Sequence, residues 1–233
     1  MSIINNLVFL GIGAAFNPVM GNTSAWFVQD GKLFILDCGE TVFERLWYLP
    51  ELRTCEDIYV AITHLHNDHV GSLAALASAC LHELGKKIHV IHPEQTITTL
   101  LALMGISGEE YFYHAGMPDT EVSFQATPVE HAGDMKSYGY IVKTNNWSFY
   151  FSGDARSIPG EVLERFYEGD IGFIYQDTSV EDAPNHAKLS YLERVIPEEM
   201  RGRVYSVHLE KDARGKILEK GFQIPDFKGD NHE

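Results

Sequence analysis

Short apolar runs separated by turn-forming residues dominate the first half of the chain, and this pattern predicts buried strands. The strands are expected at 7–10, 25–28, 33–36, 58–62 and 88–91. The pair Asp30-Gly31 predicts a tight hairpin between the second and third of them, because both residues tolerate positive φ angles. Apolar residues at helical spacing predict helices over 41–49 and 70–84, and Gly85 is a stop signal for the longer one.

The second half of the chain begins with three β-type segments and continues with alternating strands and helices. Strands are expected at 122–129, 138–144, 147–151, 171–175 and 204–207, and helices at 188–195 and 210–220. The pair Asn145-Asn146 marks a hairpin turn. Two sheets with helices outside them satisfy this order of elements in one α/β domain. We expect that domain to span residues 1–224, followed by a polar tail at 225–233.

Composition and charge narrow the classes of function. The 233 residues are 45% hydrophobic and 22% charged, which is typical of a globular chain that buries its own core. The net charge of −15 disfavours a large nucleic-acid footprint and binding to an anionic membrane. No basic residue precedes the apolar stretch 7–16, so no signal peptide is predicted, and no apolar run reaches the length of about 18 residues that spans a membrane. With three cysteines in no metal-type spacing, these features indicate a cytoplasmic protein.

The strongest chemical signal follows the predicted strand 58–62. The segment Thr63-His64-Leu65-His66-Asn67-Asp68-His69 places four ligand-type side chains within six residues. A loop at the end of a strand is a common place for a functional site. Imidazole and carboxylate groups together suit zinc, and also manganese or iron. We therefore predict a metal site that includes His64, His66, Asp68 and His69.

This H-x-H-x-D-H pattern resembles the signature of the metallo-β-lactamase fold. Further parts of that family's pattern follow in order: Asp37 after the strand 33–36, His131 in Val129-Glu130-His131, Asp154 in Phe151-Ser152-Gly153-Asp154, and His208 in Ser206-Val207-His208. The resemblance extends over about residues 7–224. It implies a four-layer αββα sandwich with a dinuclear metal site between the two sheets.

The resemblance also implies a role for each motif residue. One metal ion is expected to bind His64, His66 and His131, and a second ion to bind Asp68, His69 and His208. Asp154 is expected to bridge the two ions, which are most readily zinc, with manganese as the alternative. A metal-bound bridging hydroxide then serves as the nucleophile. Asp37 either orients a ligand from behind the site or caps a turn at the end of its strand.

Within this fold, the chain resembles the phosphodiesterase branch that includes tRNase Z. The opening Leu10-Gly11-Ile12-Gly13 with Asn22-Thr23-Ser24, and the segment Ser137-Tyr138-Gly139-Tyr140 after His131, are similar to that branch. The resemblance suggests that Asn22, Ser24 and Ser137 contact the substrate. The segment between His131 and Asp154 has room for one hairpin only, so the long basic arm with which tRNase Z commonly grips tRNA is absent. The chain is therefore most similar to compact phosphodiesterases such as the phage anti-Pycsar nucleases, which hydrolyse 3′,5′-cyclic nucleotides.

Two residues are expected to take a direct part in catalysis. Asp68 is one, as a member of the metal motif, and His186 is the other. His186 precedes His208 as an additional, non-ligand histidine does in tRNase Z enzymes, where it assists phosphate binding and protonates the leaving group. The alternative for His186 is an ordinary loop histidine after Pro184-Asn185. Asp177 either orients His186 or makes a turn at the end of a strand.

The sequence thus predicts a dinuclear metal-dependent phosphodiesterase that acts on a small cyclic phosphodiester. Two alternatives stay open: a tRNA 3′-processing endonuclease of the tRNase Z type, and a protein that sequesters a nucleotide without turnover. Phe112 with Tyr113, or Tyr138 with Tyr140, are aromatic pairs that can stack on a base or fill the core. Relatives in this branch are commonly dimers, so a homodimer is expected, in which a partner loop can cover the open site.

Overall fold

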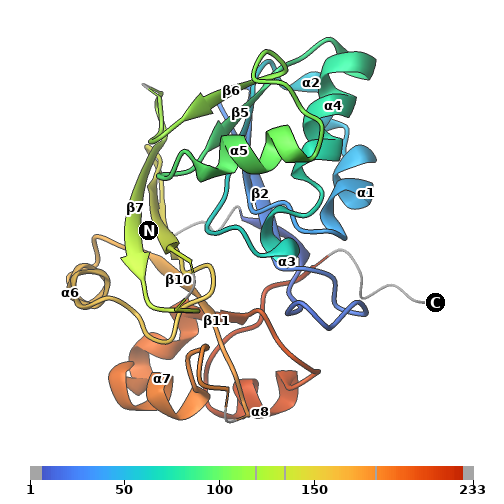
Figure 1. Cartoon of the computed structure of the whole chain (residues 1–233). Coiled ribbons are helices and arrows are strands. Elements are labelled where there is room, and N and C mark those ends of the chain that lie inside the picture. The colour runs from blue at the N-terminus through green and yellow to red at the C-terminus, as the bar shows by residue number, and fades with distance from the viewer. Residues whose placement is uncertain (1–6, 119, 134, 182, 228–233) are drawn as a thin grey trace.

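The structure, a computed structural model, describes residues 7–118, 120–133, 135–181 and 183–227, and two β-sheets form its centre (Figure 1). The first sheet has the strand order β1-β2-β3-β4-β5-β6 and the second has the order β11-β10-β9-β8-β7. The first consists of β1 (Val8–Gly11), β2 (Ser24–Gln29), β3 (Lys32–Leu36), β4 (Ile58–Ala61), β5 (Ile88–Ile91) and β6 (Tyr111–His114). The second consists of β7 (Ser123–Val129), β8 (Ser137–Lys143), β9 (Ser148–Phe151), β10 (Phe173–Asp177) and β11 (Val204–Val207).

Helices cover the outer face of each sheet, which gives the predicted αββα sandwich (Figure 1). Beside the first sheet lie α1 (Val42–Trp47), α2 (Glu51–Thr54), α4 (Leu73–Leu84) and α5 (Thr96–Leu103), with the single turn α3 (Asn67–Val70) at its edge. Beside the second lie α6 (Gly160–Tyr167), α7 (Leu189–Val195), α8 (Arg214–Glu219) and the 3₁₀ helix Glu198–Arg203. Each layer therefore buries apolar surface against the next.

Alternation along the strands explains why both sheets are buried on both faces. In β3, Leu33 and Ile35 pack against the helices of the first half, while Phe34 and Leu36 face the second sheet. Successive side chains of a strand point to opposite faces, so a continuous apolar run serves two hydrophobic layers. Aromatic rings fill the space between the sheets; Phe27 and Phe149 meet there edge to face, with ring centroids 6.0 Å apart.

Strand direction explains where the functional loops gather. In the first sheet β3, β4, β5 and β6 run parallel, and in the second β9, β10 and β11 do so. The carboxyl ends of parallel strands meet at one edge, which is where α/β proteins bind their ligands. Asp37 and His64 follow β3 and β4, and Asp154 and His208 follow β9 and β11, while Asp177 ends β10. The topology thus brings residues from the whole chain to one edge.

The predicted elements agree with the structure in most places. The Asp30-Gly31 hairpin is confirmed, with φ angles of 50° and 73°, and Gly85 ends α4 in the left-handed conformation. The predicted strand 171–175 forms instead at 173–177, and the last helix spans 214–219 rather than 210–220. The elements that were not predicted are α2, α3, α5, β6, α6 and the 3₁₀ helix Glu198–Arg203.

The first residues of the predicted C-terminal tail, 225–227, belong to the packed structure. Phe227 forms a β-bridge with Phe9 and packs against the core, although 225–227 belong to the predicted polar tail. The rest of that predicted tail, 228–233, lies outside the described residues. In the described part of the chain, no helix has the length and apolar character to cross a membrane.

Candidate metal centre

The loops after the parallel strands hold the candidate ligands in a strained framework. The segment after β4 carries His64 and His66, and the short α3 then carries Asp68 and His69 on its single turn. His208 has a φ angle of 59°, which side-chain-bearing residues rarely adopt. Such strain persists only where the surrounding structure enforces it, and it is concentrated at functional sites.

Four side-chain atoms converge in a first cluster at the edge of the sheets. His64 Nε2 lies 2.9 Å from His66 Nδ1, and His131 Nε2 lies 3.3 Å from the same atom. Asp154 Oδ2 lies 3.4 Å from His131 Nε2 and 3.9 Å from His64 Nε2. Three imidazoles and one carboxylate aimed at a common point form a ligand set suited to a divalent cation.

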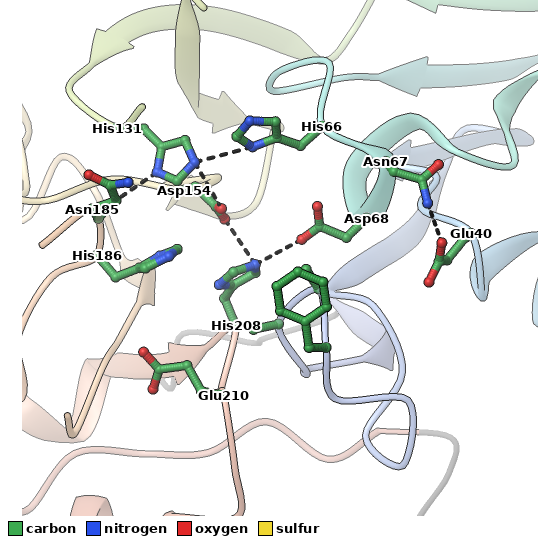
Figure 2. Close-up of a pocket in the computed structure, with 13 residues that line it drawn as sticks. Glu40, His66, Asn67, Asp68, His131, Asp154, Asn185, His186, His208 and Glu210 are labelled. Atoms are coloured by element: carbon green, nitrogen blue, oxygen red, sulfur yellow. Dashed lines mark hydrogen bonds and ion pairs between the residues drawn. The ribbon is translucent and has the colours of Figure 1, made fainter. Parts of the chain in front are cut away.

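A second cluster uses the other oxygen of the same aspartate. Asp154 Oδ1 lies 3.2 Å from both His69 Nε2 and His208 Nε2. Asp68 Oδ2 lies 3.2 Å from His69 Nε2 and 3.1 Å from His208 Nε2. The seven side chains predicted as ligands all lie in these two clusters, with Asp154 common to both, as Figure 2 shows for five of them.

The buried polar atoms at the middle of the two clusters fit a bound cation. His69 Nε2 and Asp154 Oδ1 are buried, and apart from the close contacts within the cluster neither has a hydrogen-bond partner among the described residues. A buried polar atom without a partner is costly, so such atoms at the middle of a cluster indicate a bound group. Nitrogen and carboxylate ligands in groups of four are what divalent metals require. The centre therefore fits divalent metal ions.

Electrostatics favour the same conclusion. Burial lowers the pKa of the His69 and His208 imidazoles, but the surrounding carboxylates outweigh it, so the pKa of His69 is raised well above its usual value and that of His208 to about 10. Burial acts to raise the pKa of Asp154, yet the neighbouring imidazoles bring it well below the usual range. The carboxylates thus stay ionised, and positive charge beside them stabilises them. Bound metal cations can supply this charge in place of the protons on the imidazoles.

Asp37 orients His69 from behind the centre. It is fully buried, and its Oδ2 accepts a hydrogen bond from His69 Nδ1 at 2.8 Å. Thr63 donates to the same carboxylate through its backbone N–H at 2.7 Å and its hydroxyl at 2.8 Å. His69 Nε2 is thereby left to face the second cluster, which is the arrangement expected behind a metal-binding histidine. Thr63 directly precedes the predicted motif, but its hydrogen bonds to Asp37 were not predicted from the sequence.

His186 and Asp177 form a pair beside the two clusters, and with Asp154 and His208 they make a third group of possible ligands. His186 Nδ1 donates to Asp177 Oδ2 at 2.7 Å, and the His186 ring stacks on that of His208 with centroids 5.1 Å apart. Burial lowers the pKa of His186, but the hydrogen bond and charge of Asp177 outweigh it, so the pKa is raised. Asp177 Oδ1 also lies 3.5 Å from His208 Nδ1. The carboxylate thus faces both a candidate ligand and the extra histidine.

A cleft of about 470 Å³ opens over the two clusters (Figure 2). Its lining includes six of the predicted site residues: His66, Asp68, His131, Asp154, His186 and His208. Sequence reasoning missed several other lining residues: Ala14, Ala15, Phe16, Glu40, Asn67, Asn185 and Glu210. Asn185 also accepts a hydrogen bond from His131 Nδ1 on its backbone oxygen at 3.0 Å. The neighbouring motifs pointed to these loops, but no pattern indicated that these side chains face the cleft.

Three residues predicted to contact the substrate, Asn22, Ser24 and Ser137, are not among the residues that line the cleft, and their contact with a substrate stays a prediction. Asn22 is buried and accepts hydrogen bonds from the backbone N–H and hydroxyl of Thr41. Ser24 is fully buried and donates to the backbone oxygen of Asp37 at 2.8 Å. Ser137 is buried at the start of β8. The side chains of Asn22 and Ser24 thus hold loops next to the candidate ligands.

Comparisons with known proteins place these features in a family. Residues 5–224 match the sequence pattern of a family described as anti-Pycsar protein Apyc1. The anti-Pycsar protein Apyc1 of Paenibacillus harenae is 27% identical over 85% of this chain and 87% of its own length. The Ribonuclease Z of Methanococcus maripaludis is 25% identical over 66% of this chain and 46% of its own length. In structure, the metallo-β-lactamase fold protein YhfI of Bacillus subtilis is similar with a TM-score of 0.76, at 12% identity over 96% of each chain.

Proposed function

Since the chain belongs to the family of the anti-Pycsar protein Apyc1, we propose that it is a phosphodiesterase that hydrolyses a 3′,5′-cyclic nucleotide with two divalent metal ions per chain. One observation carries this proposal. Two groups of four ligand atoms hold the seven predicted ligands and share the carboxylate of Asp154 at the base of a cleft, and a third group places His186 and Asp177 close to Asp154 and His208. Two metal sites that share a carboxylate are a recurring arrangement in enzymes that displace groups at phosphorus.

The ligand assignment follows from which atoms converge. His64, His66 and His131 would hold one ion and Asp68, His69 and His208 the other, with one oxygen of Asp154 for each. When bound, the ions acidify water to give a nucleophile near neutral pH and neutralise the charge of the phosphate. Zinc suits the nitrogen-rich first set best, with manganese as the alternative. Asp68 would take part in catalysis as a ligand of the second ion.

His186 is proposed as the proton donor to the leaving oxygen. Its Nδ1 is engaged by Asp177, which fixes the tautomer and leaves Nε2 as the second site for a proton. His186 lines the cleft, so it can reach a bound substrate. Opening a cyclic phosphodiester expels a sugar alkoxide, which requires a proton, and a histidine with a raised pKa is suited to supply it.

The size and charge of the cleft favour a small substrate. A volume of about 470 Å³ lies within the range that small-molecule sites occupy. Among the described residues, the lining of the cleft includes no lysine or arginine, whereas Glu40 and Glu210 both face it. A surface that binds a long phosphate backbone relies on many basic side chains. The net charge of −15 adds to the repulsion.

The direct test is hydrolysis of a panel of 3′,5′-cyclic nucleotides and a tRNA precursor by the metal-loaded protein. We expect conversion of at least one cyclic nucleotide to a linear monophosphate, loss of activity in a chelator, and recovery on adding zinc or manganese. Bis-p-nitrophenyl phosphate is included as a generic phosphodiester. Cleavage of the tRNA precursor alone would contradict the proposal.

The second candidate is a tRNA 3′-processing endonuclease, which the similarity to the archaeal Ribonuclease Z favours. The match covers only 46% of that enzyme's length, so more than half of the Ribonuclease Z sequence is not aligned with this chain. A third outcome is tight binding of a cyclic nucleotide without release of product. That result would show a sequestering protein in which the metal centre holds the phosphate.

The proposal includes a homodimer that acts in the cytoplasm. A cleft open to solvent gains from a neighbouring subunit that excludes water. Light scattering at increasing concentration tests the assembly, because one chain has a mass of 26.2 kDa. A mass that stays at one chain at the highest concentration would contradict the dimer.

A further inference from the structure

Phe16 is the most exposed large hydrophobic residue in the described part of the chain, with 98% of its surface accessible. It lies in the lining of the cleft together with Ala14 and Ala15. Leaving a phenyl ring in water is unfavourable, and a ring at the mouth of a binding site gains free energy when a ligand covers it. The exposure of this ring therefore points to a ligand with an apolar face.

The loop that carries Phe16 is fixed to the metal centre. Ala14 donates its backbone N–H to the backbone oxygen of Leu209 at 3.0 Å, and Asn17 Nδ2 donates to the same oxygen at 3.0 Å. Asn17 is itself buried, and its Oδ1 accepts the backbone N–H of Met20 at 3.3 Å. Phe16 thus stands between two anchored residues, and both anchors hold the residue directly after His208. The position of its backbone relative to the centre is set by the fold.

We propose that Phe16 is the stacking platform of a nucleobase subsite at the mouth of the cleft, an inference that rests on the proposed function. The metal clusters occupy the base of the cleft and would take the phosphate, so the space toward Phe16 falls to the rest of the substrate. Every nucleobase offers a π-face to an aromatic ring. The cleft lining offers carboxylates and amides there, not cationic side chains for a further phosphate.

The aromatic pairs considered from the sequence do not provide this platform. Tyr138 and Tyr140 are buried, and their hydroxyls donate to Glu94 and to the backbone oxygen of Ile62. Phe112 lies on β6 and is absent from the cleft lining. Phe16 is the aromatic residue that the structure places at the cleft among the described residues.

The test compares two cyclic phosphates that differ only in the base. One is adenosine 3′,5′-cyclic monophosphate, and the other is the methyl riboside 3′,5′-cyclic phosphate, which has a methoxy group in place of adenine. Phe16→Ala should raise KM for the adenosine compound by about 5- to 100-fold, the range expected for loss of one base–aromatic stack, with little change in kcat. The same variant should leave the methyl riboside compound unchanged, and Phe16→Trp should restore the KM for adenosine.

Val19→Ala is the matched control, because Val19 is 73% exposed on the same loop and does not line the cleft. It should behave as wild type on both compounds. An equal loss on both compounds in Phe16→Ala, or a change in its oligomeric state, would overturn the base subsite and leave the ring a structural or subunit contact.

A binding measurement separates failure of this inference from failure of the proposed function. The fluorescence of 2-aminopurine riboside 3′,5′-cyclic phosphate should fall on mixing with the metal-loaded protein, and the fall should be lost in Phe16→Ala. Absence of hydrolysis with retained quenching would contradict the phosphodiesterase and keep the subsite. Hydrolysis with equal quenching in both proteins would contradict the subsite alone.

Discussion

Two buried aspartates, one at the end of a strand in each sheet, lie next to candidate metal ligands, yet their contacts differ. Asp37 follows β3, Asp177 ends β10, and both are fully buried. The Asp37 carboxylate accepts hydrogen bonds from Thr63 and His69, which both lie in the first half of the chain. Asp177 instead accepts a short hydrogen bond from His186, which lines the cleft, and lies 3.5 Å from the candidate ligand His208.

This difference teaches that a buried carboxylate at the end of a strand can serve two purposes. In the first half of the chain, Asp37 orients only the candidate ligand His69. Its two partners, Thr63 and His69, are not among the residues that line the cleft. In the second half, Asp177 joins a candidate ligand to the proposed proton donor. Substitutions in the two halves should therefore separate metal affinity from proton transfer.

The largest effect is expected at the residue that both halves share. Asp154→Ala removes both oxygens that the two ion sites have in common, so it should weaken both metal sites and lower kcat by roughly 10⁴-fold or more. Steady-state kinetics and elemental analysis of the same sample measure the two effects. A variant that kept two ions and near-normal turnover would rule out the bridging role.

His186→Ala should have the next largest effect and should spare the metals. General acid catalysis contributes about 10²–10⁴-fold, so kcat for a cyclic nucleotide should fall by that amount. The loss should shrink for bis-p-nitrophenyl phosphate, because its leaving group needs little protonation. His64→Ala is the control, and it should damage both substrates equally. Wild-type turnover of the cyclic nucleotide by His186→Ala would show that His186 is only a loop residue.

Asp177→Asn tests the coupling that sets the second half apart. The side-chain oxygen of the new asparagine can still accept the hydrogen bond from His186. The negative charge that raises the pKa of His186 is lost. We expect a smaller loss in kcat than in His186→Ala, on the order of 10- to 10³-fold, and the same dependence on the leaving group. With the metal saturating, the double variant should lose no more than His186→Ala alone, whereas additive losses would contradict the coupling.

Asp37→Asn should give the smallest loss, confined to metal binding. Removing a partner behind a ligand typically lowers metal affinity by about 10- to 100-fold. The ratio of rates on the two substrates should stay at the wild-type value when the metal is saturating, because the proton donor is untouched. Competition with a chelating dye measures the affinity, and a changed substrate ratio would contradict the separation of the two halves.

The sequence predicted the fold and the candidate ligands well for a physical reason. Alternating apolar strands report burial locally, and four ligand-type residues within 64–69 need no distant partner to be noticed. His131 and His208 stand alone in the chain, so only the family resemblance singled them out. The helix α5 was missed because its Thr-Ile-Thr-Thr segment favours strands, although Ile97 and Leu101 share one buried face.

The residues that line the cleft beyond the predicted ligands and His186 were the part that the sequence did not show. Asn22 and Ser24 belong to a motif of the family, but a motif does not tell whether a side chain faces the ligand or the framework. Phe16 lines the cleft on a loop that Ala14 and Asn17 both tie to Leu209, a contact between distant parts of the chain. Such placement depends on tertiary hydrogen bonds that local patterns do not encode.

The central claim is that two divalent ions share the Asp154 carboxylate in one cleft, and a metal count tests it most directly. The pure protein is reconstituted with zinc, freed of excess metal, and measured by elemental analysis against its concentration. The account predicts two ions per chain, because the two clusters offer four ligand atoms each. One ion or none in the fully loaded wild-type protein would contradict it.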